Sequence, residues 1–252
     1  MHPVAAAGFG AGAAVYERAR PSYPQEAIDW IVDRTGLGRS RTVVDVGAGT
    51  GKLTRLLVAT GARVIAVEPV AEMRAKLEEV LPGVEALDGT AESMPLADGT
   101  ADVITAAQAF HWFDRERAFP ELHRVLAPDG FLVLIWNSRD LDDPLQSAVE
   151  DVLAPLRGSV VWEQSFDWQP EVERSPLFGP VEPRTFVLDQ RLTIDELAER
   201  VASTSFVAAM TEAEQAPLLA RVRALVAGAG EPFSFRYRTE VFVIARGTSN
   251  EG

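Results

Sequence analysis

The sequence contains no cysteine and only three histidines in its 252 residues. The absence of cysteine excludes disulfide bonds, thiolate nucleophiles and metal ions held by cysteine. The histidines, at positions 2, 111 and 123, are too scattered to predict a metal site. With 47% hydrophobic residues the chain can bury a large core without cross-links, and its length suits one α/β domain with insertions.

Lysine is also scarce. Lysine occurs only at Lys52 and Lys76, and the formal net charge is −13. A nucleic-acid-binding surface needs clustered basic residues to offset the phosphate charge, and the sequence has no run rich in lysine and arginine. We therefore expect no nucleic-acid partner. Arginine-dominated positive charge with abundant alanine is typical of a GC-rich bacterial genome.

Long hydrophobic runs are missing as well. The longest uncharged N-terminal run, residues 4–16, is too short to span a bilayer and has no basic leader. We interpret residues 1–14 as a flexible arm and residues 247–252 as a tail. The sequence thus favours a cytoplasmic protein with no membrane partner, whose single domain covers residues 15–246.

Strand and helix patterns alternate over residues 41–137, the core of this domain. Short apolar runs at 42–46, 63–67, 84–87, 101–107 and 131–136 are typical of buried strands. Amphipathic helices are expected at 25–35, 52–60, 70–80 and 115–126. This alternation predicts an α/β fold, a doubly wound, mostly parallel sheet with helices on both faces.

The pattern changes over residues 138–246. Helices are expected at 145–156, 193–203 and 211–226, and a strand at 184–192. Residues 233–245 alternate between apolar and polar, as in an antiparallel strand or hairpin. Prolines at 170, 176, 180 and 183 indicate a stretch rich in loops.

A glycine loop follows the first strand. Asp45 precedes glycines at positions 47, 49 and 51, and such glycines let backbone approach a ligand closely. Dinucleotide sites favour G-x-G-x-x-G, but the third glycine of that motif would fall on Lys52. The chain also has no Tyr-x-x-x-Lys, so a nicotinamide-dependent dehydrogenase is disfavoured. Taken alone, the loop is also compatible with a tight turn that binds nothing.

Glu68 stands at the end of the second strand, about 20 residues after the loop. A carboxylate there can accept hydrogen bonds from both hydroxyls of a ribose. Glycine loop and acidic residue together predict a nucleoside site, without choosing between dinucleotide and other nucleoside cofactors.

Four segments carry a family resemblance: DVGAGTGKLT from residue 45, AVEPVAEM from residue 66, residues 87–113, and HRVLAPDGFLVLIWN from residue 123. They resemble the class I S-adenosylmethionine (SAM)-dependent methyltransferases with a methyltransferase type 11 domain. The likeness is closest to the trans-aconitate methyltransferase-like subgroup and is strongest over residues 43–137. It implies a Rossmann-like sheet of seven strands with an antiparallel last strand, SAM as cofactor, S-adenosylhomocysteine as product, and no metal.

The resemblance also implies a set of cofactor-binding residues: Tyr16, Arg20, Gly47, Ala48, Gly49, Gly51, Glu68, Pro69, Met73, Thr90, Ala91, Glu92, Gln108 and Phe110. The glycine loop would line the methionine and ribose, Pro69 and Met73 the adenine face, and Ala91 and Glu92 the adenine edge. Relatives often carry aspartate at position 90. Threonine can still accept a hydrogen bond from the adenine amine, but a weaker one.

The segment after the fourth strand would meet the methyl group. His111 is the candidate catalytic residue: a base for a hydroxyl or amine acceptor, a positioning group for a carboxylate, or a purely structural histidine. Trp112 is a candidate substrate wall or a core residue, and Phe113 is favoured as core. Arg20 could pair with a carboxylate of SAM or substrate, or be a solvated surface residue.

The favoured function is methyl transfer to a small molecule, at a carboxylate or hydroxyl oxygen, by a monomer or homodimer. The alternative is a SAM-binding protein with a regulatory or scaffold role.

Overall fold

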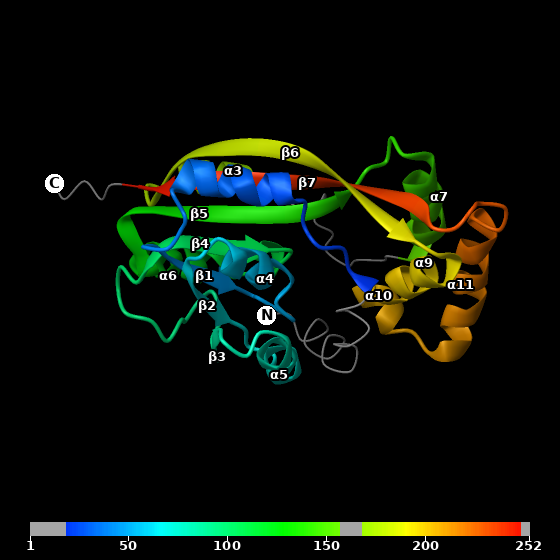
Figure 1. The fold of residues 1–252 in the computed structure, drawn as a ribbon, viewed down its shortest axis with the longest axis horizontal. Coiled ribbons are helices and arrows are strands. Elements are labelled where there is room, and N and C mark those ends of the chain that lie inside the picture. Colours follow the sequence, from blue (N-terminus) through cyan, green and yellow to red (C-terminus); the bar gives the residue numbers. More distant parts are fainter. Residues whose placement is uncertain (1–18, 157–167, 248–252) are drawn as a thin grey trace.

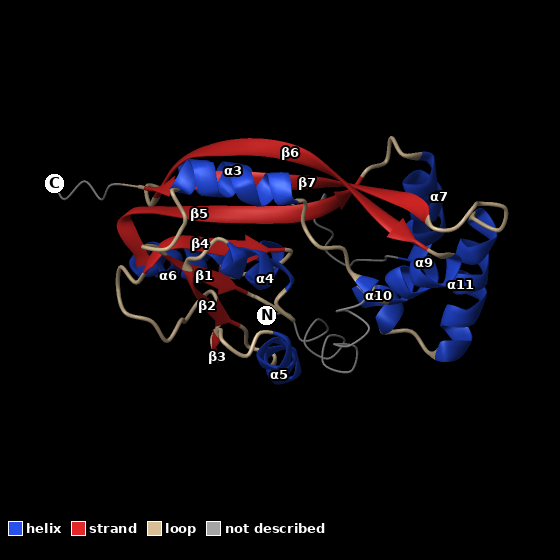
Figure 2. Ribbon diagram, in the orientation of Figure 1, coloured by secondary structure: helices blue, strands red, loops and turns tan. Residues whose placement is uncertain are grey.

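The computed structural model describes residues 19–156 and 168–247. Its centre is a seven-stranded sheet in the order β3-β2-β1-β4-β5-β7-β6 (Figures 1 and 2). The strands are β1 Thr42–Val46, β2 Arg63–Val67, β3 Glu85–Leu87, β4 Ala101–Ala107, β5 Leu126–Arg139, β6 Phe178–Leu192 and β7 Phe233–Arg246. β7 pairs antiparallel with both β5 and β6, while the pairs from β3 to β5 are parallel. This confirms the predicted fold.

The central strands end at the same edge of the sheet. Val46 of β1 lies beside Val67 of β2, and Asp45 lies beside Thr105 of β4. The strand order reverses between β1 and β4, which is the position where open α/β sheets bind ligands. The loops that follow these three strands therefore converge at one edge.

Helices cover both faces of the sheet, as predicted. On one face, α3 (Gln25–Thr35) and α4 (Lys52–Ala59) bury Ile28, Ile31 and Leu57 in one hydrophobic cluster with Val43 and Val103. On the other face, α6 (Arg115–Val125) packs against the opposite side chains of the same strands, including Val44 and Ile104. Alternate strand residues thus contribute to opposite cores, which explains why these runs are apolar throughout. Helix α5 (Ala71–Val80) connects β2 to β3.

A helical unit lies beyond one end of the sheet (Figure 1). It comprises α7 (Pro144–Leu153), α9 (Ile194–Ala202), α10 (Ser205–Ala208) and α11 (Glu212–Leu225). Its own hydrophobic cluster packs Leu153, Leu197 and Val222 against Phe235 and Tyr237 of β7. Because β5 ends and β7 begins here, this unit stands at the same edge as the loops after β1, β2 and β4.

Two stretches differ from the sequence-based expectation. β5 begins at Leu126 rather than at residue 131, and β6 begins at Phe178 and runs through Pro180 and Pro183. β6 is the last strand of the sheet, and an edge strand tolerates proline because one row of its backbone N–H groups needs no strand partner. Pro170 lies in a short helix, α8 (Gln169–Arg174), near its start, where proline is favoured.

Candidate functional site

Two cavities meet at the carboxyl edge of the sheet and share the wall formed by Gly47, Gly49, Ala107 and Gln108. The first, here called the apolar cavity, encloses about 700 Å³, part of it open to solvent. The second, here called the polar cavity, encloses about 540 Å³, again partly open to solvent. The rest of the apolar cavity is lined by Val46, Glu68, Pro69, Val70, Met73, Thr90, Ala91, Glu92, Ala109, Trp112 and Phe113. The rest of the polar cavity is lined by Arg20, Pro21, Tyr23, Asp45, Ala48, Thr50, Lys52, Leu53, Asn137 and Arg200.

The glycine loop adopts the left-handed backbone that its glycines permit, with φ of +68° at Gly47, +59° at Gly49 and +88° at Gly51. A Cβ on Gly47 would stand 2.7 Å from Cβ of Ala109, so the loop approaches the segment after β4 closely. Gly51 lines neither cavity. A Cβ there would stand 3.0 Å from Leu81, so Gly51 instead serves the packing of α4 beside the end of α5.

Glu68 is a buried carboxylate at the junction of the glycine loop and β2. Its Oε2 accepts a hydrogen bond from the N–H of Gly49 at 2.8 Å, and its Oε1 accepts one from Val70 at 2.9 Å. Burial raises the pKa of Glu68 above its usual value, while these backbone donors and nearby Arg74 oppose the rise. A carboxylate has about four acceptor positions, so these two bonds leave capacity toward the apolar cavity.

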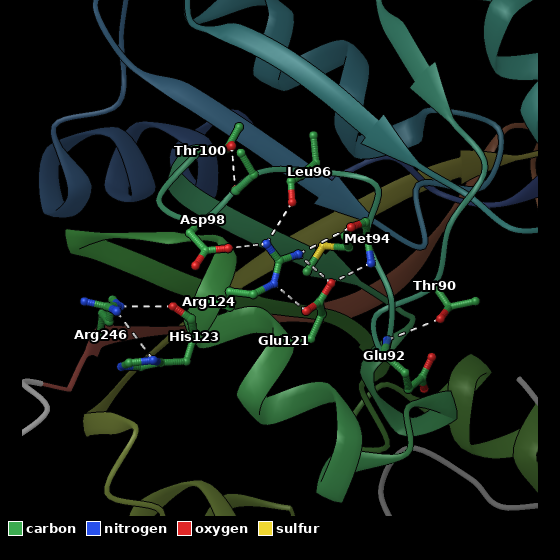
Figure 3. A network of polar contacts seen from close by, with 11 residues as sticks. Thr90, Glu92, Met94, Leu96, Asp98, Thr100, Glu121, His123, Arg124 and Arg246 are labelled. Atoms are coloured by element: carbon green, nitrogen blue, oxygen red, sulfur yellow. Dashed lines mark hydrogen bonds and ion pairs between the residues drawn. The ribbon is translucent and has the colours of Figure 1, made fainter.

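The loop between β3 and β4 forms another wall of the apolar cavity and is held by α6 (Figure 3). The carboxylate of Glu121 accepts the N–H of Met94 at 2.7 Å. Arg124 donates to the carbonyl of Leu96 at 2.8 Å and pairs with Asp98 and Glu121. These contacts fix the loop that presents Thr90, Ala91 and Glu92 to the cavity.

The segment after β4 places its aromatic residues in two environments. Gln108 turns the chain with a positive φ of 55° and lines both cavities. Trp112 and Phe113 are half-buried and line the apolar cavity. Phe110, in contrast, is fully buried, and its ring contacts those of Phe113, Phe119, Trp136 and Trp168. Phe110 therefore lies in the core rather than beside the cofactor, where the resemblance placed it. Phe113 packs against that core, as the sequence favoured, and also lines the apolar cavity.

His111 lies between the core and the site. It lines neither cavity, and its ring centroid stands 4.7 Å from that of Trp112. Its Nδ1 is buried and has no hydrogen-bond partner in the described part of the chain. Burial, reinforced by the charge of Arg20, lowers the pKa of His111 to about 4. The imidazole is consequently neutral at physiological pH and is a weak base.

The polar cavity carries three cationic side chains: those of Arg20, Lys52 and Arg200. Arg20 donates to the carbonyl of Ser203 at 2.9 Å. Arg200, on α9, is 8% exposed, and its Nε donates to the hydroxyl of Tyr237 at 2.8 Å. Within residues 19–156 and 168–247, no carboxylate forms an ion pair with Arg200. Sequence reasoning missed Arg200 because nothing near it in the chain indicates a site; only the folding of α9 over the sheet edge brings it there.

Asp45 is the carboxylate of the polar cavity. It is 1% exposed and accepts hydrogen bonds from the hydroxyls of Thr54 at 2.6 Å and Thr105 at 2.8 Å. Burial raises its pKa to about 6 despite these bonds. Asp45 thus joins β1 to α4 and β4 directly beneath the glycine loop.

Asn137 is a second residue that sequence reasoning missed. Its amide donates to the carbonyl of Ser22 at 2.9 Å and accepts the hydroxyl of Thr239 at 2.6 Å. It therefore attaches the segment that carries Arg20 to β5 and β7. Tyr16 and the arm of residues 1–14, both expected from the sequence, lie outside the described residues.

Comparison with known proteins supports a single family. A family model described as a methyltransferase domain matches residues 44–134. An uncharacterized methyltransferase of Mycobacterium tuberculosis is 40% identical over 87% of this chain and 85% of its own length. The chain belongs to the methyltransferase family. An uncharacterized methyltransferase-like protein of Schizosaccharomyces pombe is 36% identical over 82% of this chain and 81% of its own, so relatives occur in bacteria and eukaryotes.

Solved structures agree on the fold. A candidate type II methyltransferase from Anaeromyxobacter dehalogenans has a TM-score of 0.66 at 25% identity, covering 90% of this chain and 97% of that one. A phosphoethanolamine methyltransferase from Haemonchus contortus, solved with S-adenosylhomocysteine and phosphomonomethylethanolamine, has a TM-score of 0.56 at 15% identity, covering 96% of this chain and 58% of that one. These names do not favour a regulatory or scaffold role for the methyltransferase described here.

The described residues contain no group of three or more histidine or acidic residues arranged to hold a metal ion. None of the helices among them is long and apolar enough to cross a bilayer.

Proposed function

We propose that this methyltransferase uses SAM and transfers its methyl group to a small acidic molecule. The observation that carries the first part is the position of Glu68, hydrogen-bonded to the glycine loop and lining the apolar cavity. A ribose at this point would find both a carboxylate and the close backbone approach that Gly47 and Gly49 allow.

In this proposal the apolar cavity would bind the adenine part of the cofactor and the polar cavity its methionine part. Pro69, Met73 and Ala91 provide apolar surface for an adenine ring, with Thr90 as an acceptor for its amine. The methionine part, which ends in a carboxylate, fits the polar cavity beside Arg20. The shared wall at Gly47 and Gln108 would then hold the sulfonium between them.

When bound, SAM would supply an electrophilic methyl group to the acceptor, with S-adenosylhomocysteine as the leaving group. The protein's contribution is positioning, which can supply roughly 7–11 kcal/mol of the barrier. Trp112 and Phe113 line the apolar cavity, where they would exclude water, and aromatic rings of this kind suit a cation.

The charges of the polar cavity support an acidic acceptor. One cationic side chain can pair with the cofactor carboxylate, and Arg200 remains as a buried cation that lines the same cavity. A carboxylate acceptor is already ionised at neutral pH and needs no base, in keeping with the lowered pKa of His111. In this proposal His111 acts as a positioning group in the segment that follows β4, and it does not act as a base. We further propose that the protein belongs to the trans-aconitate methyltransferase-like subgroup and that its domain runs from residue 15 to residue 246. We also propose that it is a cytoplasmic monomer or homodimer without nucleic-acid or membrane partners.

Calorimetric titration with SAM, S-adenosylhomocysteine and NADH tests the cofactor. We expect binding of the first two and none of NADH; binding of NADH alone would overturn the proposal. Transfer of radiolabelled methyl groups from SAM to paired carboxylic acids and their amides then tests the acceptor class. Labelling of amides but not acids would contradict the acidic acceptor and leave the cofactor assignment intact.

A further inference from the structure

Glu92 forms a hydrogen bond between two walls of the apolar cavity that are far apart in the sequence. Its Oε1 accepts the backbone N–H of Asp114 at 2.8 Å. Glu92 belongs to the loop after β3, whereas Asp114 directly precedes α6 and follows the cavity residues Trp112 and Phe113. The side chain of Glu92 therefore binds the end of the segment that follows β4, which forms another wall of the same cavity.

This hydrogen bond caps the N-terminus of α6, which has no side-chain cap of its own. The side chain of Asp114 makes no capping hydrogen bond. In a capping box, a glutamate at the third helical position accepts the N–H of the capping residue, but Arg117 occupies that position in α6. Glu92 provides the missing carboxylate from a different element, and its charge also suits the positive end of the helix dipole.

Glu92 can act as an anchor because its own loop is held in place. Thr90 and Ser93 exchange two backbone hydrogen bonds of 3.1 Å, and the hydroxyl of Thr90 accepts the N–H of Glu92 at 3.3 Å (Figure 3). Beyond Glu92, Met94 is bound by Glu121. Burial raises the pKa of Glu92, but hydrogen bonding to its carboxylate by the Thr90 side chain and by the backbone N–H groups of Asp114 and Glu92 itself outweighs burial and lowers the pKa. The carboxylate therefore stays ionised at neutral pH.

The segment that follows β4 is also anchored at its beginning. The N–H of Gln108 donates to the carbonyl of Ile135 at 2.9 Å, which fixes the beginning of the segment on β5. Glu92 fixes its end. We infer that Glu92 is a positioning residue. It couples ligand binding at the wall formed by Thr90, Ala91 and Glu92, here called the adenine-side wall, to the placement of Trp112 and Phe113 at the methyl-transfer end. The coupling to a bound cofactor rests on the proposed function, whereas the hydrogen bond between Glu92 and Asp114 does not.

Hydrogen–deuterium exchange on the full chain tests the anchor from both ends. Glu92→Ala removes the acceptor. Asp114→Pro removes the donor, at a backbone φ of −76° that proline adopts without strain. Without ligand, each variant should speed exchange of peptides covering residues 112–117 by roughly ten- to a hundredfold, the scale of a hydrogen bond to a charged group. Glu92→Gln should retain protection, because its amide oxygen can still accept. Glu116→Ala, which changes an exposed acid on α6 outside this bond, serves as the matched control.

The same measurement with S-adenosylhomocysteine tests the coupling. In the wild type, the ligand should further protect residues 112–117; in Glu92→Ala, compared at a ligand concentration that saturates each protein, it should transmit little of that protection. Unchanged exchange of these peptides in both Glu92→Ala and Asp114→Pro would overturn the inference. So would full transmission of protection in Glu92→Ala. If S-adenosylhomocysteine does not bind the wild type, the proposed cofactor fails, and the ligand-free comparison still decides the anchor.

Discussion

At the scale of single residues, burial determines which side chains carry chemistry at this site. Glu68, Asp45 and Arg200 are each at least nine-tenths buried and line a cavity. A buried charged group is costly unless it is hydrogen-bonded, and each of the three has a fixed donor or acceptor beside it. Such groups are preorganised, so replacing them should affect binding more than exposed charges do.

Glu68→Ala should weaken binding of SAM and S-adenosylhomocysteine by roughly 1.5–3 kcal/mol, the scale for hydrogen bonds to a charged group. Calorimetry measures this loss. Glu85→Ala removes an exposed acid at the sheet edge and should leave affinity unchanged. Wild-type affinity in Glu68→Ala would remove this residue from the cofactor site.

Asp45 should make the stability of the protein depend on pH. Its pKa is raised from 3.8 to about 6 in the folded state, so folding favours its protonated form. Its contribution to stability is therefore fully present below pH 3.8 and is lost as the pH rises through about 6, by about 3 kcal/mol. Urea unfolding across this range should show the wild type losing stability relative to Asp45→Asn, whose side chain stays neutral. Parallel curves for the two proteins would contradict the raised pKa.

At the scale of elements, α6 holds the loop that forms the adenine-side wall. Arg124→Met removes bonds to two loop carbonyls and to Glu121, and should lower the free energy of unfolding by about 1–3 kcal/mol and weaken S-adenosylhomocysteine binding. Asp98→Asn breaks only the pair with an 80%-exposed carboxylate and should cost less than about 1 kcal/mol. Denaturant unfolding and calorimetry of both variants check this. Equal losses of unfolding free energy in the two variants would show that the exposed ion pair with Asp98 fixes the loop, rather than the hydrogen bonds from Arg124 to the loop carbonyls.

At the scale of the whole molecule, the helical unit brings α9 to the edge of the sheet and adds Arg200 to the polar cavity. Arg200→Gln should raise the KM for an acidic acceptor roughly ten- to a hundredfold while leaving S-adenosylhomocysteine affinity within about twofold. Arg223→Gln makes the same change of charge on an exposed residue of α11 and is the control. Steady-state methylation and calorimetry separate the two effects. A tenfold loss of S-adenosylhomocysteine affinity in Arg200→Gln would instead assign this arginine to the cofactor carboxylate.

Much of this architecture could be predicted from local pattern. The strands at 42–46, 63–67 and 101–107 have the expected bounds, because a strand buried on both faces must be apolar throughout. The edge strand β6 could not be bounded in the same way. Its prolines usually indicate loops, and they are tolerated only because the strand lies at the end of the sheet.

The sequence by itself determined the order of strands and helices along residues 41–137, the glycine turn after β1 and the acidic residue after β2. Each of these depends on residues within a few positions of one another and on rules of backbone geometry. Only the tertiary structure decided which aromatic of the 110–113 segment faces the cavity, that Arg200 reaches the polar cavity, and that Glu92 holds the start of α6. Glu92 and Asp114 are 22 positions apart, and Arg200 is far in the sequence from the other residues of the polar cavity. The packing of helices on the sheet, rather than any local pattern, brings them together.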